Sequence, residues 1–159
     1  MTPSAEPPSH QPADRADHPD ADHRRPRDAD DETVWAVGKL TEALESVERA
    51  RGHLYSFHQL TGKADFELDD AVDALRRAGH HALAERVSTE LVGRNVLPGR
   101  WTFQILEDYE EGYVTPFREV ERDVREQLVA GRRHLYEAEL KERRRTRTDP
   151  DDPSHRARP

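Results

Sequence analysis

The chain has 159 residues, 36% of them charged and 33% hydrophobic, and its net charge at pH 7 is -8. It contains no cysteine, which excludes disulfides, thiolate zinc sites and thiol nucleophiles. No stretch approaches the roughly 18 consecutive apolar residues that a membrane helix needs, and the N-terminus lacks the basic start and apolar run of a signal peptide. We therefore expect a soluble cytoplasmic protein with one small domain and no membrane partner.

Both ends of the chain are poor in apolar residues. Residues 1–32 hold six of the eleven prolines and no Val, Ile, Leu, Phe, Trp or Tyr, and residues 143–159 carry runs of Arg and Asp around Pro150 and Pro153. A segment that buries nothing cannot offset the entropy lost on ordering its backbone. The sequence therefore predicts disordered tails at 1–32 and 143–159 and a folded domain at 33–142.

The first half of that domain has the apolar spacing of a long helix. Its stripe advances by three, four, three and seven residues and consists of Val37, Leu40, Leu44, Val47 and Leu54. Thr33 is the expected cap, and Gly62 stands where a helix commonly ends in a left-handed residue. We predict a helix at about 33–61.

Two shorter helical patterns follow. "ADFELDDAVDALRRAG" and "HHALAERVSTELVG" each carry one apolar face, and they meet at Gly79, which predicts a helical hairpin. "GRNVLPGRW", with two glycines and Pro98, predicts a loop.

The last pattern predicts a second long helix, at about 102–142. Its stripe comprises Phe103, Leu106, Glu110, Tyr113, Phe117, Val120 and Val124. Pro116 removes one hydrogen bond and predicts a kink, with Gly112 as an alternative place for a break. The predicted fold class is an all-α bundle of two long helices with a short helical hairpin between them.

Polar residues interrupt the two apolar stripes. His53 and His58 are five residues apart, so on a helix they point about 140° apart and do not hold one ion. Extending the first stripe places Arg51 and His58 on the buried seam, and Glu110 lies on the other stripe. An unpaired buried charge costs several kcal/mol, so we expect Arg51 to pair with a carboxylate of residues 107–111 and fix the helix register. The simpler interpretation, which the pattern favours, is that Arg51 reaches solvent and His58 forms an ordinary hydrogen bond near the helix end.

Two sites of lower rank remain open. A divalent metal would draw on His58, Glu107, Glu110, Glu111 and His134, although the order of His134 and Glu137 is the reverse of the Glu-x-x-His motif of di-metal bundles. A magnesium site of the nucleotide-hydrolysing helical type would use Glu67, Asp70 and Asp73, which also fit an ordinary acidic helix start. An exposed acidic face is the simpler interpretation, and we expect no cofactor.

Two cationic segments complete the candidates. Arg94, Asn95 and Arg100 would form an anion-binding loop, unless Gly93 is only a helix cap and Trp101 a core anchor. The basic end "KERRRTRT" offers a weak, salt-sensitive nucleic-acid contact without aromatic residues, and "DPDDP" follows it directly. Nucleic acid is not the expected partner.

The blocks "RGHLYSFHQLTGKADFELDDAVDALRRAGH" and "VGRNVLPGRWTFQILEDYEEGY" resemble a group of uncharacterised small helical proteins from high-GC bacteria. The resemblance covers roughly residues 35–145 and implies neither an activity nor a role for any residue. From the residues we predict a non-catalytic interaction or scaffolding module. A protein partner or a second copy would cover its remaining apolar stripe. The alternatives are a metal-binding bundle, which would include a metal-dependent enzyme, and a weak nucleic-acid binder.

Overall fold

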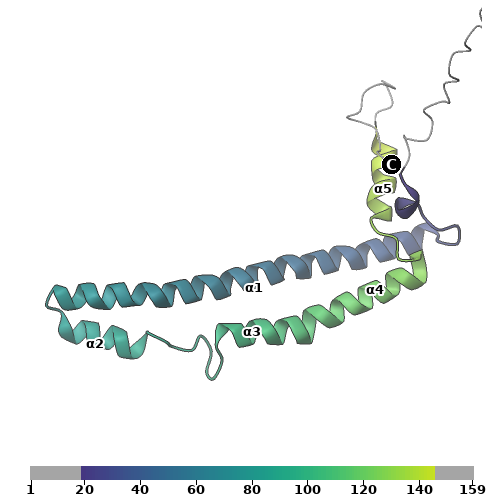
Figure 1. Ribbon diagram of the computed structural model, residues 1–159. Helices are drawn as coiled ribbons and strands as arrows, with labels where there is room; N and C mark the ends of the chain where they lie inside the picture. Colours follow the sequence, from purple (N-terminus) through teal and green to yellow (C-terminus); the bar gives the residue numbers. More distant parts are fainter. Residues whose placement is uncertain (1–18, 146–159) are drawn as a thin grey trace, which may run out of the picture. The chain divides into compact units, whose positions relative to one another are not determined.

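The computed structural model describes residues 19–145, which are helical and contain no β-strand (Figure 1). The predicted all-α class is confirmed, and a helical bundle fits. In chain order the elements are the 3-10 turn η1 (Ala21–His23), α1 (Asp31–Arg77), α2 (His81–Glu90), α3 (Thr102–Tyr109), the π-helical segment η2 (Glu110–Val114), α4 (Thr115–Val129) and α5 (Leu135–Arg144). Within this range no helix combines the length and hydrophobicity needed to span a membrane.

The described chain forms two compact units. Unit 1 contains residues 19–39 and 123–145, and unit 2 contains residues 40–122. These two units differ from the single domain predicted at 33–142. Helices α1 and α4 each contribute residues to both units.

Helix α1 is longer than predicted at both ends. Asp30, not Thr33, caps its start, because the Asp30 carboxylate accepts the Thr33 N–H at 2.8 Å. At the other end the helix continues through Gly62 to Arg77, so the predicted end at residue 61 is wrong. A glycine inside a helix costs only about 1 kcal/mol, and continuation lets α1 bury Val72.

The predicted hairpin is present as a turn between α1 and α2. Gly79 occupies the left-handed region at φ +83°, which glycine adopts without strain, and the Gly79 N–H donates to the Arg76 carbonyl at 3.0 Å. The first arm of the hairpin is the end of α1, however, rather than a separate helix. Residues 91–101 form the predicted loop.

The second long helix is interrupted twice. The π-helical segment η2 separates α3 from α4 just before Pro116, close to the predicted kink. Helix α4 ends at Val129, and Ala130, Gly131 and His134 have positive φ before α5 begins. The prediction of a helix continuing from 102 to 142 is therefore wrong.

Unit 1 includes part of both segments that were predicted to be disordered. Its core consists of Ala29, Val34, Val37, Val129 and Leu135, with Val124 packed against it. The Arg25 guanidinium donates to Glu139 at 2.7 Å and to Asp31 at 2.6 Å, which raises the pKa of Arg25. Residues 19–32 thus belong to a packed unit, and helix α5 reaches Arg144. The rest of the predicted tails, 1–18 and 146–159, lies outside the described residues.

Candidate functional site

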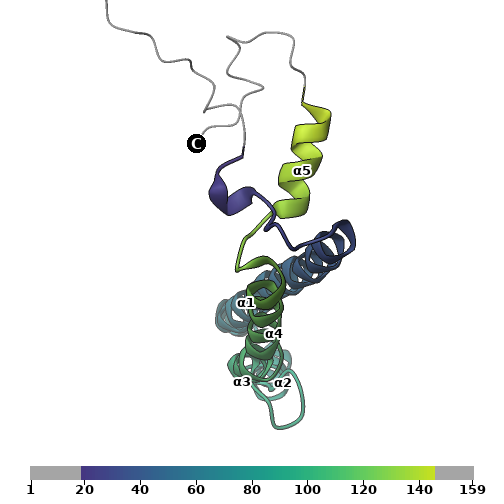
Figure 2. The same cartoon turned by 90° about the vertical axis from the view of Figure 1, so that its right-hand side faces the viewer.

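In unit 2, polar contacts join α1 to the returning segment from α3 to α4, and the partners run in opposite directions along the chain. Glu48 meets Arg118, Arg51 meets Glu110, and His58 meets Thr102. Figures 1 and 2 both place α3 and the start of α4 beside α1. The order of these contacts shows that the two helical stretches are antiparallel.

The predicted pairing of Arg51 with a carboxylate of residues 107–111 is confirmed. Arg51 Nε donates to Glu110 Oε2 at 2.5 Å, and the Glu110 hydrogen bond raises the pKa of Arg51. Arg51 Nη2 also donates to the Tyr55 hydroxyl at 3.3 Å, and the guanidinium lies 4.8 Å from the centre of the Tyr55 ring. The pair is only half-buried, with 31% of the Arg51 side chain and 26% of the Glu110 side chain exposed.

His58 does not join that pair. Its Nδ1 lies 2.7 Å from the Thr102 hydroxyl oxygen, at the start of α3. His58 therefore forms an ordinary hydrogen bond, as the simpler interpretation predicts. Arg51 pairs with a carboxylate, as the other interpretation predicts.

Sequence reasoning missed two members of the same network. Arg118 donates through Nε and Nη2 to the two carboxylate oxygens of Glu48, at 2.5 and 2.8 Å, and through Nη1 to Glu110 Oε1 at 3.2 Å. The hydrogen bonds from Arg118 hold the pKa of the Glu48 carboxyl below its usual range. We call Glu48, Arg51, Glu110 and Arg118 the polar ladder. Its two positive and two negative charges alternate and cancel.

The π-helical segment explains why Arg118 was missed. The Thr115 N–H donates to the Glu110 carbonyl, five residues back, so η2 holds one residue more than a regular helical turn. Every later side chain is displaced around the helix relative to the regular period, by about 100° per residue. Val114 and Glu121 are therefore buried, at 0% and 4% exposure, instead of the predicted neighbours Tyr113 and Val120.

Apolar side chains before, within and after η2 form a ridge on unit 2, in which Tyr113 and Val120 are exposed and Tyr109 and Phe117 are half-buried. Tyr113 is 50% exposed and Val120 is 59% exposed. The Tyr113 ring stacks on Tyr109 at 5.5 Å between centroids and lies 6.0 Å from Phe117. We call Tyr109, Tyr113, Phe117 and Val120 the aromatic ridge.

The geometry of the polar ladder is structural rather than catalytic. Both of its carboxylates accept hydrogen bonds from guanidinium groups, which remain protonated at neutral pH and transfer no proton. In the described part of the chain, no three His, Asp or Glu side chains form a group that could hold a metal ion. The candidate metal ligands are therefore not brought together: Glu107 and Glu111 are exposed, and His134 belongs to unit 1, where its ring stacks on His23 at 6.4 Å.

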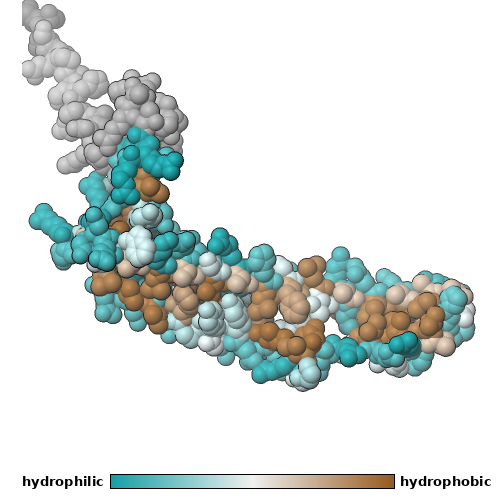
Figure 3. Space-filling model, turned by 180° about the vertical axis from the view of Figure 1, so that it is seen from behind, coloured by the Kyte–Doolittle hydropathy of each residue, from teal (hydrophilic) through white to brown (hydrophobic). Residues whose placement is uncertain are grey.

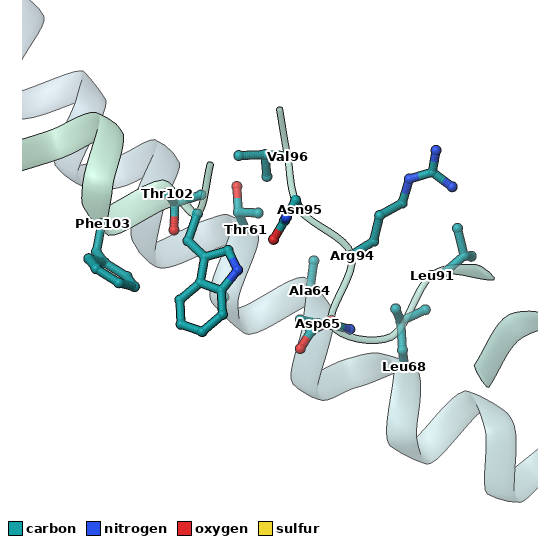
Figure 4. A pocket seen from close by; sticks show the side chains of 13 residues that line it. Thr61, Ala64, Asp65, Leu68, Leu91, Arg94, Asn95, Val96, Thr102 and Phe103 are labelled. Atoms are coloured by element: carbon teal, nitrogen blue, oxygen red, sulfur yellow. The ribbon is translucent and has the colours of Figure 1, made fainter. Parts of the chain in front are cut away.

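The predicted anion-binding loop is also not assembled. Arg100 pairs with Asp108, and Arg94 Nη1 donates to the Glu90 carbonyl at 3.2 Å. The loop does border a cavity of about 500 Å³ against α1, lined by Arg94 and Asn95 but not by Arg100. Figure 4 shows the Arg94 side chain extending away from the other labelled side chains of this cavity. A carboxylate, Asp65, faces the same cavity from α1 and offsets the charge of Arg94, so the cavity lacks the net positive charge expected of an anion site.

No family model, no curated protein and no solved structure matches this chain.

Proposed function

We propose that this protein is a non-catalytic interaction module that assembles with a second copy of itself through the aromatic ridge. The observation that carries the proposal is the position of the ridge. Tyr113 and Val120 project from unit 2, while two charged residues of the same segment, Arg118 and Glu121, face helix α1. Exposed and contiguous apolar side chains of this size are typical of interaction surfaces.

The thin core of unit 2 supports the same conclusion. Its buried apolar residues in the described chain are Val47, Val72, Ala84 and Val114, whereas many larger apolar side chains are exposed. Figure 3 shows separate hydrophobic patches over unit 2, one of them at the end that carries α2. Two antiparallel helices cover each other on one side only, and a four-helix arrangement needs a second pair. A second copy supplies that pair.

Residues 1–18 contain Met1 as their only large apolar side chain, and residues 146–159 contain none. These segments therefore offer few apolar groups that match the ridge, which favours a partner surface from another chain. The ridge carries no charged side chain, which favours self-association over a strongly charged partner such as nucleic acid.

The heptad-like spacing of α1 favours coiled-coil packing within each chain, where Val37 and Val47 are buried, and leaves the aromatic ridge as the surface between copies. The polar ladder would keep each helix pair in register, as buried polar groups do in coiled coils. The proposal places the assembly in the cytoplasm, where a chain without cysteines is unaffected by the reducing conditions.

Light scattering during size-exclusion chromatography tests this proposal. At about 100 μM, well above a micromolar dissociation constant, the full chain should elute with twice its mass of 18.3 kDa. Val120→Glu should return it to the mass of one chain. Leu83→Glu is the matched control, because Leu83 is similarly exposed, at 54%, on α2 and away from the ridge. A wild-type mass of one chain at every concentration would overturn the proposal.

A further inference from the structure

Unit 2 contains a cavity that the proposed self-association does not use. It lies between α1 and the segment that leads from α2 into α3, and its volume is about 500 Å³. In Figure 4, Ala64, Asp65 and Leu68 project from α1 opposite the stretch of chain that carries Arg94 and Asn95. The remaining walls come mainly from Leu91, Val96, Trp101 and Phe103. A concave, mostly apolar site with a few polar groups is the usual form of a small-ligand pocket.

Gly62 borders this cavity, and the packing of unit 2 does not require a glycine at this position. It lies inside the regular helix α1, where alanine is the better helix former. A Cβ atom at Gly62 would meet no heavy atom within 4 Å, in contrast to Gly38, which Tyr136 approaches to 3.4 Å in unit 1. The missing side chain therefore leaves open space at the cavity wall that the packing of unit 2 does not require.

Two charged side chains, Asp65 and Arg94, line the cavity, and they do not pair with each other. Asp65 Oδ1 accepts the Gly93 N–H at 2.7 Å, and no ion pair joins Asp65 to another residue within 19–145. The basic side chains of the nearby loop are engaged elsewhere, Arg94 with the Glu90 carbonyl and Arg100 with Asp108. Asp65 can therefore accept hydrogen bonds from a cation that enters the cavity.

Two aromatic rings stand at the start of α3. Trp101 and Phe103 pack edge to face, with centroids 5.4 Å apart and ring planes at 75°. Both are unusually exposed for their size, at 59% and 40%. Aromatic faces attract organic cations through the ring quadrupole and also pack against apolar groups.

We propose that this cavity binds a small organic cation: a primary ammonium group carried on an aromatic or branched apolar body. The ammonium group donates hydrogen bonds to Asp65, and the apolar body packs against Leu68, Trp101 and Phe103. The open space beside Gly62 accommodates the part of the ligand nearest α1.

The fluorescence of Trp101 provides the test. The chain contains two tryptophans, Trp35 and Trp101, so Trp35→Phe leaves Trp101 as the sole reporter. In this variant of the full chain, 2-phenylethylamine should produce a saturable change in emission. The matched anion 3-phenylpropanoate should produce none, because Asp65 repels it.

Three further variants, made in the Trp35→Phe background, identify the site. Asp65→Asn should weaken amine binding at least about tenfold, which is the loss of one charge-assisted contact. Gly62→Ala should weaken binding to a similar degree while raising the melting temperature, so that misfolding does not explain the loss. Gly52→Ala changes another glycine of α1 whose added Cβ would meet nothing within 4 Å, and it should raise the melting temperature and leave binding unchanged.

The proposal is overturned if the amine and the acid give the same response, if neither gives a saturable response up to about 10 mM, or if Asp65→Asn binds the amine as tightly as the parent. Binding is read from Trp101 and self-association from mass. Either proposal can therefore fail while the other stands.

Discussion

Deletion of Gly112 tests whether the π-helical segment sets the register of α4. Because η2 holds one residue more than a regular turn, removing one residue there restores regular i→i+4 bonding without rotating α4 against α3. Gly112 is exposed, and a Cβ atom there would meet nothing within 4 Å, so no packing is lost with it. The pairing of Arg118 with Glu48 should therefore survive the deletion.

The expected energetic effect is small. Removing a glycine from a helix interior relieves about 0.5–1 kcal/mol, so the free energy of unfolding should stay within about 1 kcal/mol of wild type. The melting temperature, followed by circular dichroism at 222 nm, should be unchanged or rise by a few degrees, since 1 kcal/mol corresponds to about 4–8 °C in a domain of this size.

Deletion of Gly52 is the matched control. Gly52 is also an exposed glycine with nothing within 4 Å of an added Cβ, but it lies in the regular helix α1. Its loss rotates one half of α1 against the other by about 100°. Either Val47 or Val72 then leaves its buried position, at a cost of about 1.5–3 kcal/mol for the valine alone. If deleting Gly112 lowers the melting temperature as much as deleting Gly52, the register argument is refuted.

Three smaller predictions follow from individual positions. Gly131→Ala should destabilise the protein by about 1–2 kcal/mol, measured by urea unfolding, because Gly131 has φ +71° and its new Cβ would lie 2.6 Å from a Glu126 oxygen. Gly52→Ala, at a helical φ, should instead stabilise it by about 0.5–1 kcal/mol in the same assay. Glu48→Gln should reduce the acid sensitivity of unfolding: Arg118 lowers the pKa of folded Glu48, so the stability from this pair is present above about pH 4.5 and is lost as the pH falls through the folded pKa. Unfolding midpoints between pH 6 and pH 3 should show this change for Glu48→Gln and not for Glu45→Gln, an exposed carboxylate of the same helix.

The helical class and one long-range contact could be predicted because they depend on local rules. Apolar spacing identifies helices, and Gly79 ends α1 at the predicted turn. The Arg51–Glu110 pair followed from two polar interruptions of apolar stripes, since a charge on a packed seam needs a partner.

The helix ends could not be predicted because they depend on tertiary contacts. Gly62 has a low helix propensity, but continuation of α1 brings Val72 into a buried position, and tertiary burial overrides propensity. At the N-terminal side, Ala29 is buried in unit 1 although its neighbours in sequence are polar and proline-rich. A tail without large apolar residues can still pack when ion pairs such as Arg25–Glu139 hold it.

The exposed ridge could not be predicted for a different reason. A strictly regular period places Tyr113 and Val120 inside, and only the additional residue of η2 places Val114 and Glu121 there instead. Pro116 and Gly112 marked the location of the irregularity without indicating its form. Arg118 was missed for the same reason, and Glu48, on the regular helix α1, was missed together with its partner.

Chemical cross-linking at the ridge tests the proposed self-association most directly. Because the chain has no cysteine, Val120→Cys introduces a single thiol whose reaction reports that position alone. A short bismaleimide should join Val120→Cys chains into a covalent dimer and leave Leu83→Cys chains as monomers. Equal yields for the two variants, or dimers only from Leu83→Cys, would contradict assembly through the aromatic ridge.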